Sequence, residues 1–386
     1  MEPGRSLVLP AGLAIAAGAA TVLPGFLIGA LALQIRGDLD VSVAAVASGV
    51  TVFFAAGAVG AGPGGRLAER MGALRSIRAC VVTTAVCLLL GGLLAQSLAV
   101  LLVLLAVAGL ANAVTQPAIN LFMADQVPLA RQGLAFGIKQ AAIPAAVLVS
   151  GLALPVLALP LGWRPTFVVC AAGALAVAAL VRRSATSFVP PPARDRAPRP
   201  SRALIVTAVG AALASAGPNS LGAYLVASAV DAGIAEGAAG LLAAAGSATA
   251  LLARVALGER ADRRRDYGFT AVVVLLAAGT GGFLLLATGE AALFVVGAFV
   301  AFALGWGWPG LFNLAVVDLN RNAPGAATGV TQTGIYVGAA GGPAAFGVVS
   351  AQAGYSAAWA VSGGLCVVAA VTFAYAARLA RQRAGV

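Results

Sequence analysis

Long apolar stretches, separated by short polar segments, recur along the whole chain. Each is roughly 20 residues or longer, which is the length an α-helix needs to cross a lipid bilayer. None of them alternates strictly between apolar and polar positions, as a strand of a membrane barrel would, so we expect helices. The twelve predicted spans lie at 8–34, 41–65, 76–95, 98–122, 133–159, 164–181, 203–230, 235–257, 268–287, 291–316, 325–350 and 355–377.

The composition excludes a water-soluble fold. Hydrophobic residues make up 61% of the chain and charged residues 10%, whereas soluble domains average roughly 45–50% and 25%. The first span is too long for a cleaved signal peptide, so we expect it to remain in the protein. The sequence therefore predicts an all-α polytopic membrane protein.

The net charge of +11 follows membrane topology and does not indicate nucleic-acid binding. Arginines cluster in the segments after spans 2, 6 and 8 and at the C-terminus, whereas the opposite set of connecting segments holds only Arg36 and Arg164. Because Lys and Arg accumulate in cytoplasmic loops, we expect both termini and the arginine-rich segments on the cytoplasmic side. These segments carry Arg66, Arg70, Arg75 and Arg78 after span 2, Arg182, Arg183, Arg194, Arg196, Arg199 and Arg202 after span 6, Arg260, Arg263, Arg264 and Arg265 after span 8, and Arg378, Arg381 and Arg383 at the C-terminus.

The chain divides into two halves built on one plan. Residues 183–202 are rich in proline and arginine, which is typical of an extended linker. We therefore expect an N-terminal six-helix bundle at 1–182 and a C-terminal bundle at 203–386. Aligning the halves without a gap pairs Pro117 with Pro309, Gly133 with Gly325, Gly137 with Gly329, Gln140 with Gln332 and Gly162 with Gly354.

The segment after span 2 reads GGRLAERMGALR, and a looser copy, GERADRRR, follows span 8. This pattern resembles the loop signature of the major facilitator superfamily of secondary transporters, with glutamate where the family usually has aspartate. The resemblance implies two pseudo-symmetric six-helix bundles, transport by alternating access, a monomer, and a place in the inner membrane of a bacterial cell. The matching residues are Gly65, Glu69, Arg70, Gly72, Arg75, Gly258, Asp262 and Arg263.

The resemblance also implies a gating role for the two acids of the motif. Glu69 would face the start of span 11 near Gly325, and Asp262 the start of span 5 near Gly133. A carboxylate at the positive N-terminus of a helix contributes about 0.3–2 kcal/mol, so both contacts would hold the cytoplasmic side closed. The alternative is that both segments are ordinary basic loops.

Lys139 is the only lysine of the chain, and it lies inside predicted span 5. At 1.5 Å per residue it is about 9 Å from the start of that span. A charged side chain inside a membrane is costly and indicates a functional site by default. The alternative is snorkelling, in which the ammonium bends back to the interface; for Arg254, near the predicted end of span 8, we favour that interpretation.

The acids lie in loops or at the ends of spans, and the chain has no histidine. It therefore lacks the intramembrane carboxylate or histidine that proton-driven transporters commonly use, and the buried acid that a cationic substrate would need. This pattern favours a small anionic substrate with Lys139 as its counter-ion, moved by exchange or facilitated diffusion. The alternative is an efflux pump for hydrophobic drugs or metabolites, with Lys139 structural.

Other polar and aromatic residues share the depth of Lys139 in the predicted spans. The resemblance implies that spans 1, 4, 7 and 10 line the cavity, where amides and indoles suit a small polar ligand. For each amide the alternative is a hydrogen bond between helices, worth roughly 0.6 kcal/mol. Besides Lys139, the candidate substrate-binding residues are Gln140, Asn112, Gln116, Asn219, Tyr224, Trp308, Gln332 and Tyr336, with Trp306 and Thr115 nearby.

Other classes of protein fit the sequence poorly. With no histidine, no buried acid and no nucleophile–base pair, we expect neither an enzyme nor a metal site nor a cofactor. A sensor without transport activity remains an alternative in the same fold. The four cysteines, Cys80, Cys87, Cys170 and Cys366, lie within spans and are expected to be buried apolar residues.

Overall fold

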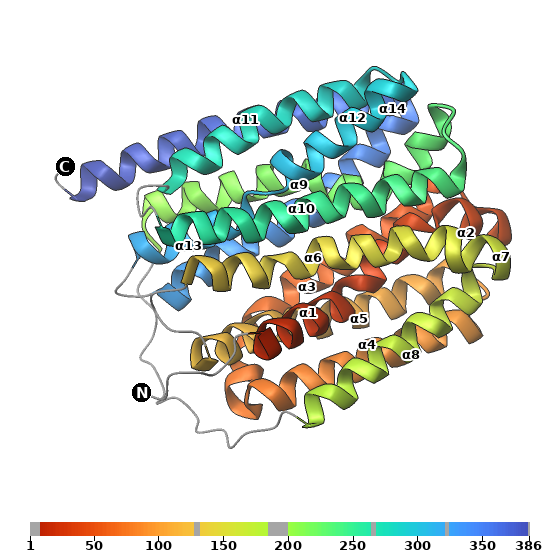
Figure 1. Ribbon diagram of the computed structural model, residues 1–386, viewed down its shortest axis with the longest axis horizontal. Coiled ribbons are helices and arrows are strands. Elements are labelled where there is room, and N and C mark those ends of the chain that lie inside the picture. Colours follow the sequence, from red (N-terminus) through yellow and green to blue (C-terminus); the bar gives the residue numbers. More distant parts are fainter. Residues whose placement is uncertain (1–7, 127–131, 184–199, 264–267, 321–323, 385–386) are drawn as a thin grey trace.

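The computed structural model describes residues 8–126, 132–183, 200–263, 268–320 and 324–384, and every regular element in them is a helix (Figure 1). Eleven helical stretches of this part of the chain are long and apolar enough to cross a membrane. The elements are α1 (Val8–Ala30), α2 (Ala32–Leu39), α3 (Val43–Met71), α4 (Ala73–Leu94), α5 (Leu98–Gln126), α6 (Gln132–Ala153), η2 (Leu154–Ala158), α7 (Leu159–Leu161), α8 (Trp163–Arg183), α9 (Arg202–Asp231), α10 (Glu236–Arg263), α11 (Gly268–Ala287), α12 (Ala291–Val300), η3 (Ala301–Gly305), α13 (Pro309–Leu319) and α14 (Pro324–Ala384).

The last helix contains two crossings. Its apolar stretch runs for 54 residues, which at 1.5 Å per residue is far longer than a bilayer is thick. Gly354 interrupts it with φ 80° and ψ 170°, a conformation that glycine adopts without steric cost. The chain reverses there, so α14 supplies predicted spans 11 and 12, and the all-α twelve-span fold is confirmed.

Three crossings are interrupted where the hydropathy pattern is continuous. The first breaks between α1 and α2 at Leu31, the fifth contains the π-helical segment η2, and the tenth contains the π-helical segment η3. After η3 the backbone turns through residues 306–308 before Pro309 begins α13. Its repeat mate Pro117 lies inside the unbroken α5, so the two halves differ at this aligned proline.

Helices α1–α8 lie together in the lower part of Figure 1, and α9–α14 lie together in the upper part. The two groups meet along α6 with α10, α3 with α14, and α1 with α9. Close backbone approach needs small residues, as is common between helices in lipid. A Cβ on Gly151 of α6 would come within 2.6 Å of the carbonyl oxygen of Gly240 on α10, and one on Gly29 of α1 within 2.4 Å of that of Gly222 on α9.

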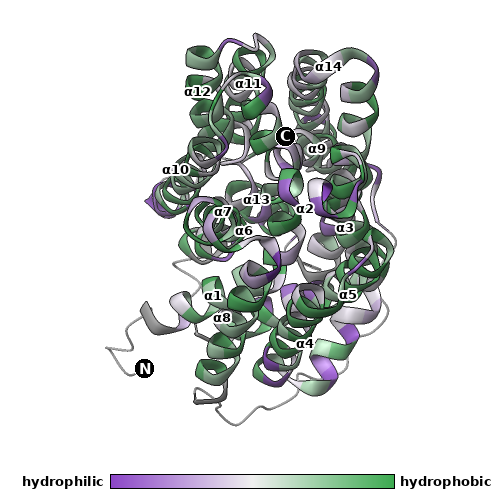
Figure 2. Cartoon of the chain, turned by 90° about the vertical axis from the view of Figure 1, so that its right-hand side faces the viewer, coloured by the Kyte–Doolittle hydropathy of each residue, from purple (hydrophilic) through white to green (hydrophobic). Residues whose placement is uncertain are grey.

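The outer faces of the helices are apolar. Val59, Val103, Leu252 and Val371 are all more than half exposed, and hydrophobic residues predominate along the helices in Figure 2, which looks along the bundle. Such a surface suits lipid and not water. We call the end at which α3 ends and α4 begins the arginine-rich end, because Arg66, Arg70, Arg75 and Arg78 lie there.

Candidate functional site

Lys139 is buried. It lies on α6 seven residues after the first residue of that helix, about 10 Å along the axis, and only 8% of its surface is exposed. Within the part of the chain that the structure describes, no hydrogen bond or ion pair satisfies its ammonium. The side chain is therefore almost entirely enclosed by protein, whereas a snorkelling lysine would extend along the surface to the interface.

Arg254 is buried more completely, with 1% of its surface exposed. The expectation that it snorkels is wrong. Helix α10 continues to Arg263, beyond the predicted end of span 8 at 257, so Arg254 lies about 14 Å from the end of the helix at 1.5 Å per residue. Its guanidinium remains inside the protein and binds backbone oxygens there.

The contacts of Arg254 join three helical segments. Its Nε and Nη2 donate to the carbonyl oxygen of Trp306 at 2.9 and 2.7 Å, and its Nη1 donates to the carbonyl oxygen of Gln140 on α6. The guanidinium carbon also lies 5.6 Å from the centre of the Trp306 ring. The carbonyl of Trp306 follows η3, where the helix breaks, so the positive charge meets the negative end of a helical segment.

Gln140, which the sequence indicated beside Lys139, thus lies at the same level as Arg254. Gly137 confirms the register, since a Cβ there would come within 2.7 Å of the carbonyl oxygen of Arg254. Lys139 and Arg254 are the two buried charged side chains among the described residues, and no Asp or Glu is buried with them. The structure therefore places two positive groups, without a buried negative one, on adjacent helices from opposite halves.

A separate polar network joins α1, α5 and α14. Asn112 of α5 accepts hydrogen bonds at its Oδ1 from Thr21 of α1 at 3.4 Å and from Gln116 at 3.3 Å. Its Nδ2 donates to the hydroxyl of Tyr336 on α14 at 3.5 Å. Three of the predicted site residues are therefore brought together across the two halves, and Thr21 is a member that the sequence did not indicate.

An aromatic cluster adjoins this network. The ring of Phe26 on α1 lies 5.7 Å from Trp306 and 5.7 Å from Phe54. Phe54 in turn lies 6.4 Å from Tyr336. The cluster joins α1 and α3 of the first half to the turn after η3 and to α14 of the second, so Trp306 is an interface residue.

Trp308 lies elsewhere. It packs against Phe312 at 5.3 Å and Phe373 at 6.1 Å, inside the C-terminal bundle, and its indole N–H has no hydrogen-bond partner among the described residues. Two tryptophans only two residues apart point to different places because the backbone turns between them. Of the two, Trp306 is the one whose ring packs on an aromatic ring of the other half.

The remaining candidates are not gathered around Lys139. Asn219 is buried and donates to the carbonyl oxygen of Ser215 within α9. Tyr224 stacks on Phe346 at 4.6 Å within the second half. Gln332 is partly buried on α14. We see no contact that links these three side chains to the two buried cations in the described residues.

The motif acid Asp262 lies where the resemblance implies. Its Oδ2 accepts a hydrogen bond of 2.9 Å from the backbone N–H of Leu134, in the first turn of α6. This contact joins the two halves at the arginine-rich end. For the other motif, Glu69 is exposed, and the side-chain surroundings of Gly325 lie outside the described residues.

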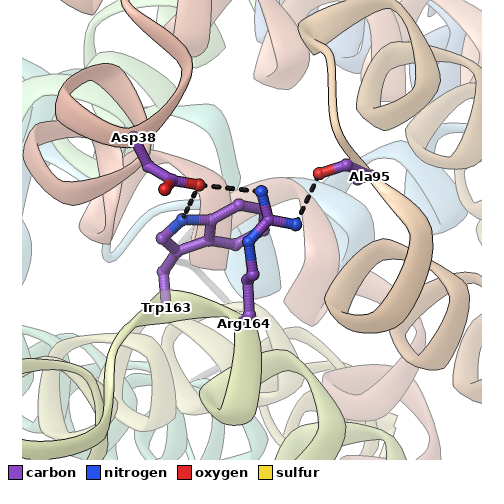
Figure 3. Close-up of polar contacts among 4 residues, drawn as sticks. All are labelled: Asp38, Ala95, Trp163 and Arg164. Atoms are coloured by element: carbon purple, nitrogen blue, oxygen red, sulfur yellow. Dashed lines mark hydrogen bonds and ion pairs between the residues drawn. The ribbon is translucent and has the colours of Figure 1, made fainter.

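The opposite end of the first half holds a different cluster. Asp38 of α2 accepts hydrogen bonds from the indole N–H of Trp163 at 3.1 Å and from Arg164 at 2.8 Å, and Arg164 also donates to the carbonyl oxygen of Ala95 (Figure 3). The guanidinium carbon lies 4.4 Å from the centre of the Trp163 ring. All four residues belong to the first half, so the cluster joins α2, α8 and the end of α4 into one unit.

The four cysteines are free and buried, as expected. In the described ranges, no group of three or more His, Cys, Asp or Glu is arranged to hold a metal ion.

Comparison with known families gives one match. The family model described as Major Facilitator Superfamily matches residues 11–227, which is more than half of the chain. A search of curated proteins finds no match.

Proposed function

The chain belongs to the Major Facilitator Superfamily, and from that premise we propose that it transports a small anionic solute, carboxylate-like in character, by alternating access. Membership makes it a multi-pass membrane protein and a secondary transporter rather than an enzyme. What we propose beyond membership is the class of solute, which we infer from the charges inside the bundle.

The observation that carries the proposal is the pair of buried cations without a buried acid. A positive side chain at the centre of a membrane costs at least about 2.5–3.5 kcal/mol. Such a charge is retained where something balances it, and within the described spans no carboxylate does so. An anionic solute would supply the missing charge, and it would do so only while bound.

Lys139 is the proposed counter-ion of the solute. Its ammonium is a compact point charge with three donors, and it forms no hydrogen bond or ion pair with the described residues. The amides of Asn112 and Gln116 and the hydroxyl of Tyr336 would bind the polar remainder of the solute. In this conformation those groups bind one another, so solute would replace contacts between the two halves.

Alternating access would use the surfaces where the halves meet. We propose that the bond from Leu134 to Asp262, and an equivalent contact of Glu69, hold the arginine-rich end closed. The positive-inside rule assigns this end to the cytoplasm, and we propose a monomer in a bacterial inner membrane. Since no described acid is buried, exchange of anions or facilitated diffusion is favoured over a proton relay.

Counterflow in proteoliposomes tests the proposal. Purified protein is reconstituted with an unlabelled solute inside, and uptake of the labelled solute is followed for pyruvate, benzoate, oxalate, nitrate and neutral drugs. The parent protein is expected to exchange at least one anion, and Lys139→Gln to lose that exchange by tenfold or more. Arg78→Gln, which removes an exposed positive charge on α4, is the matched control and should behave as the parent.

An efflux pump for hydrophobic drugs or metabolites is the second candidate, because Phe26, Phe54, Trp306 and Tyr336 form an aromatic cluster between the halves. Aromatic rings of this kind bind flat apolar solutes. Counterflow of neutral compounds alone, equal in the parent and in Lys139→Gln, would establish this second candidate and exclude the anion.

A further inference from the structure

Two N–H groups on one edge of the Arg254 guanidinium donate to the same oxygen atom. Nε and Nη2, which lie side by side along that edge, both donate to the carbonyl oxygen of Trp306, at 2.9 and 2.7 Å. A carboxylate would offer each N–H an oxygen of its own and a full negative charge, in the paired geometry that guanidinium groups favour. The Trp306 carbonyl therefore satisfies both N–H groups of this edge, but with one neutral oxygen in place of two charged ones.

From this geometry we infer that Arg254 contacts the transported anion directly, and that its Nε–Nη2 edge makes the protein selective for solutes bearing a carboxylate. The inference rests on the proposed function, since it names the chemical group that the transported anion carries. Arg254 would thus contact the solute together with Lys139.

The neighbours of Arg254 place it where a solute would pass between the halves. It reaches from α10 of the second half to Gln140 of α6 in the first half. Its other acceptor belongs to Trp306, whose ring packs on Phe26 of α1. Movement of α6 away from α10 would break the bond to Gln140, so exposure of the guanidinium accompanies separation of the halves.

The chemistry of its partners also favours an exchangeable role. Both acceptors are neutral carbonyl oxygens, and no described acidic residue forms an ion pair with Arg254. The guanidinium charge already strengthens these bonds, but a carboxylate would add the opposite charge and a second oxygen in the bidentate geometry that guanidinium groups favour. A carboxylate can therefore displace the Trp306 carbonyl, whereas a permanent salt bridge would compete with the solute.

The test compares Arg254→Lys with the parent in the counterflow assay, using whichever of pyruvate, benzoate and oxalate the parent exchanges. Lysine keeps the charge but lacks the paired N–H groups. We expect the half-saturating concentration of the carboxylate to rise at least tenfold, with the maximal rate within threefold of the parent. Arg78→Lys, on the exposed side of α4, is the matched control and should leave both quantities unchanged.

A second measurement uses the parent protein and so does not depend on the folding of a variant. Phenylglyoxal modifies arginine, and mass spectrometry reports the extent of modification at Arg254 and at Arg78. The carboxylate that the parent exchanges should slow modification of Arg254 and leave Arg78 unaffected, whereas its neutral primary amide should protect neither.

The outcomes separate this inference from the proposed function. If no anion is exchanged by the parent, the proposed function fails, and this inference with it. If anions are exchanged but Arg254→Lys keeps the half-saturating concentration of the parent, only the inference is overturned. Equal modification of Arg254 in the exchanged carboxylate and in its amide, including no modification in either, overturns it as well.

Discussion

Replacing Asp262 by asparagine tests whether the contact at the arginine-rich end holds the two halves together. The Oδ2 of Asp262 accepts a 2.9 Å hydrogen bond from the N–H of Leu134, two residues after the start of α6. Asparagine keeps a side-chain oxygen that can accept this bond. The substitution therefore removes the interaction of a negative charge with the positive helix N-terminus and leaves the shape of the side chain almost unchanged.

The size of the effect follows from the position of the carboxylate. A charge at a helix terminus contributes about 0.3–1 kcal/mol when exposed and up to about 2 kcal/mol when partly buried. Asp262 is partly buried, so we expect a loss of about 1–1.5 kcal/mol. Because about 1.4 kcal/mol corresponds to tenfold in an equilibrium constant, the fraction of molecules open at this end should rise about five- to tenfold. Asp262→Ala, which also removes the acceptor, should give a larger increase.

Cysteine labelling measures that opening. Ala141 is fully buried on α6 and lies one turn beyond Gly137, the glycine that packs against Arg254. In a background with the four native cysteines replaced by alanine, Ala141→Cys should react with a membrane-impermeant maleimide only when α6 and α10 separate. When reclosing is faster than labelling, the labelling rate is proportional to the open fraction.

The control is Glu259→Gln. Glu259 lies on the same helix and forms an exposed ion pair with Arg263 at 2.5 Å, and such exposed pairs contribute little. The labelling rate of the Glu259→Gln variant should match that of the parent. A rate for Asp262→Asn no faster than the parent rate would show that the contact does not hold the arginine-rich end closed.

Two further substitutions test the packing of the bundle. Gly151→Ala places a Cβ within 2.6 Å of the Gly240 carbonyl oxygen, so it should separate the far ends of α6 and α10 and lower the thermal unfolding temperature by several degrees. Gly173→Ala, where nothing lies within 4 Å of the added Cβ, should not lower it. Equal unfolding temperatures for Gly151→Ala and the parent would contradict the close packing. Asp38→Asn removes the ion pair with Arg164, in which the side chain of Arg164 is 34% and that of Asp38 45% exposed. Because solvent screens such pairs, we expect the free energy of unfolding to fall by about 1 kcal/mol or less. Asp40→Asn is the control, at an exposed position with φ 51° that asparagine also tolerates, and it should show no loss in the same thermal assay.

Much of the architecture could be predicted from hydropathy, because lipid leaves a helix as the only way to satisfy the backbone of an apolar span. The breaks inside spans could not. In the π-helical segments η2 and η3 each backbone N–H bonds a carbonyl one residue further back than in an α-helix. The apolar pattern of the sequence is the same for both kinds of helix. The turn after η3 is what separates Trp306 from Trp308, so the sequence could not indicate which of the two indoles lies between the halves.

The error over Arg254 has a similar origin. The polar residues that follow Leu257 suggested that the span ends there, although charged residues readily extend a helix beyond the membrane. Six additional helical residues move Arg254 from the interface to the interior. Asp262, in contrast, could be placed correctly, because the loop motif carries its own register relative to the start of α6.

Equilibrium binding to the purified protein shows whether the solute is negatively charged. Carboxylates and their isosteric primary amides differ in charge and hardly in shape, so each pair isolates the charge. In a thermal-shift titration with benzoate and benzamide, pyruvate and pyruvamide, and oxalate and oxamide, we predict that at least one carboxylate raises the unfolding temperature saturably while its amide does not. Saturable stabilisation by the amides, equal to or greater than that by the carboxylates, would show that the protein does not select a negatively charged solute.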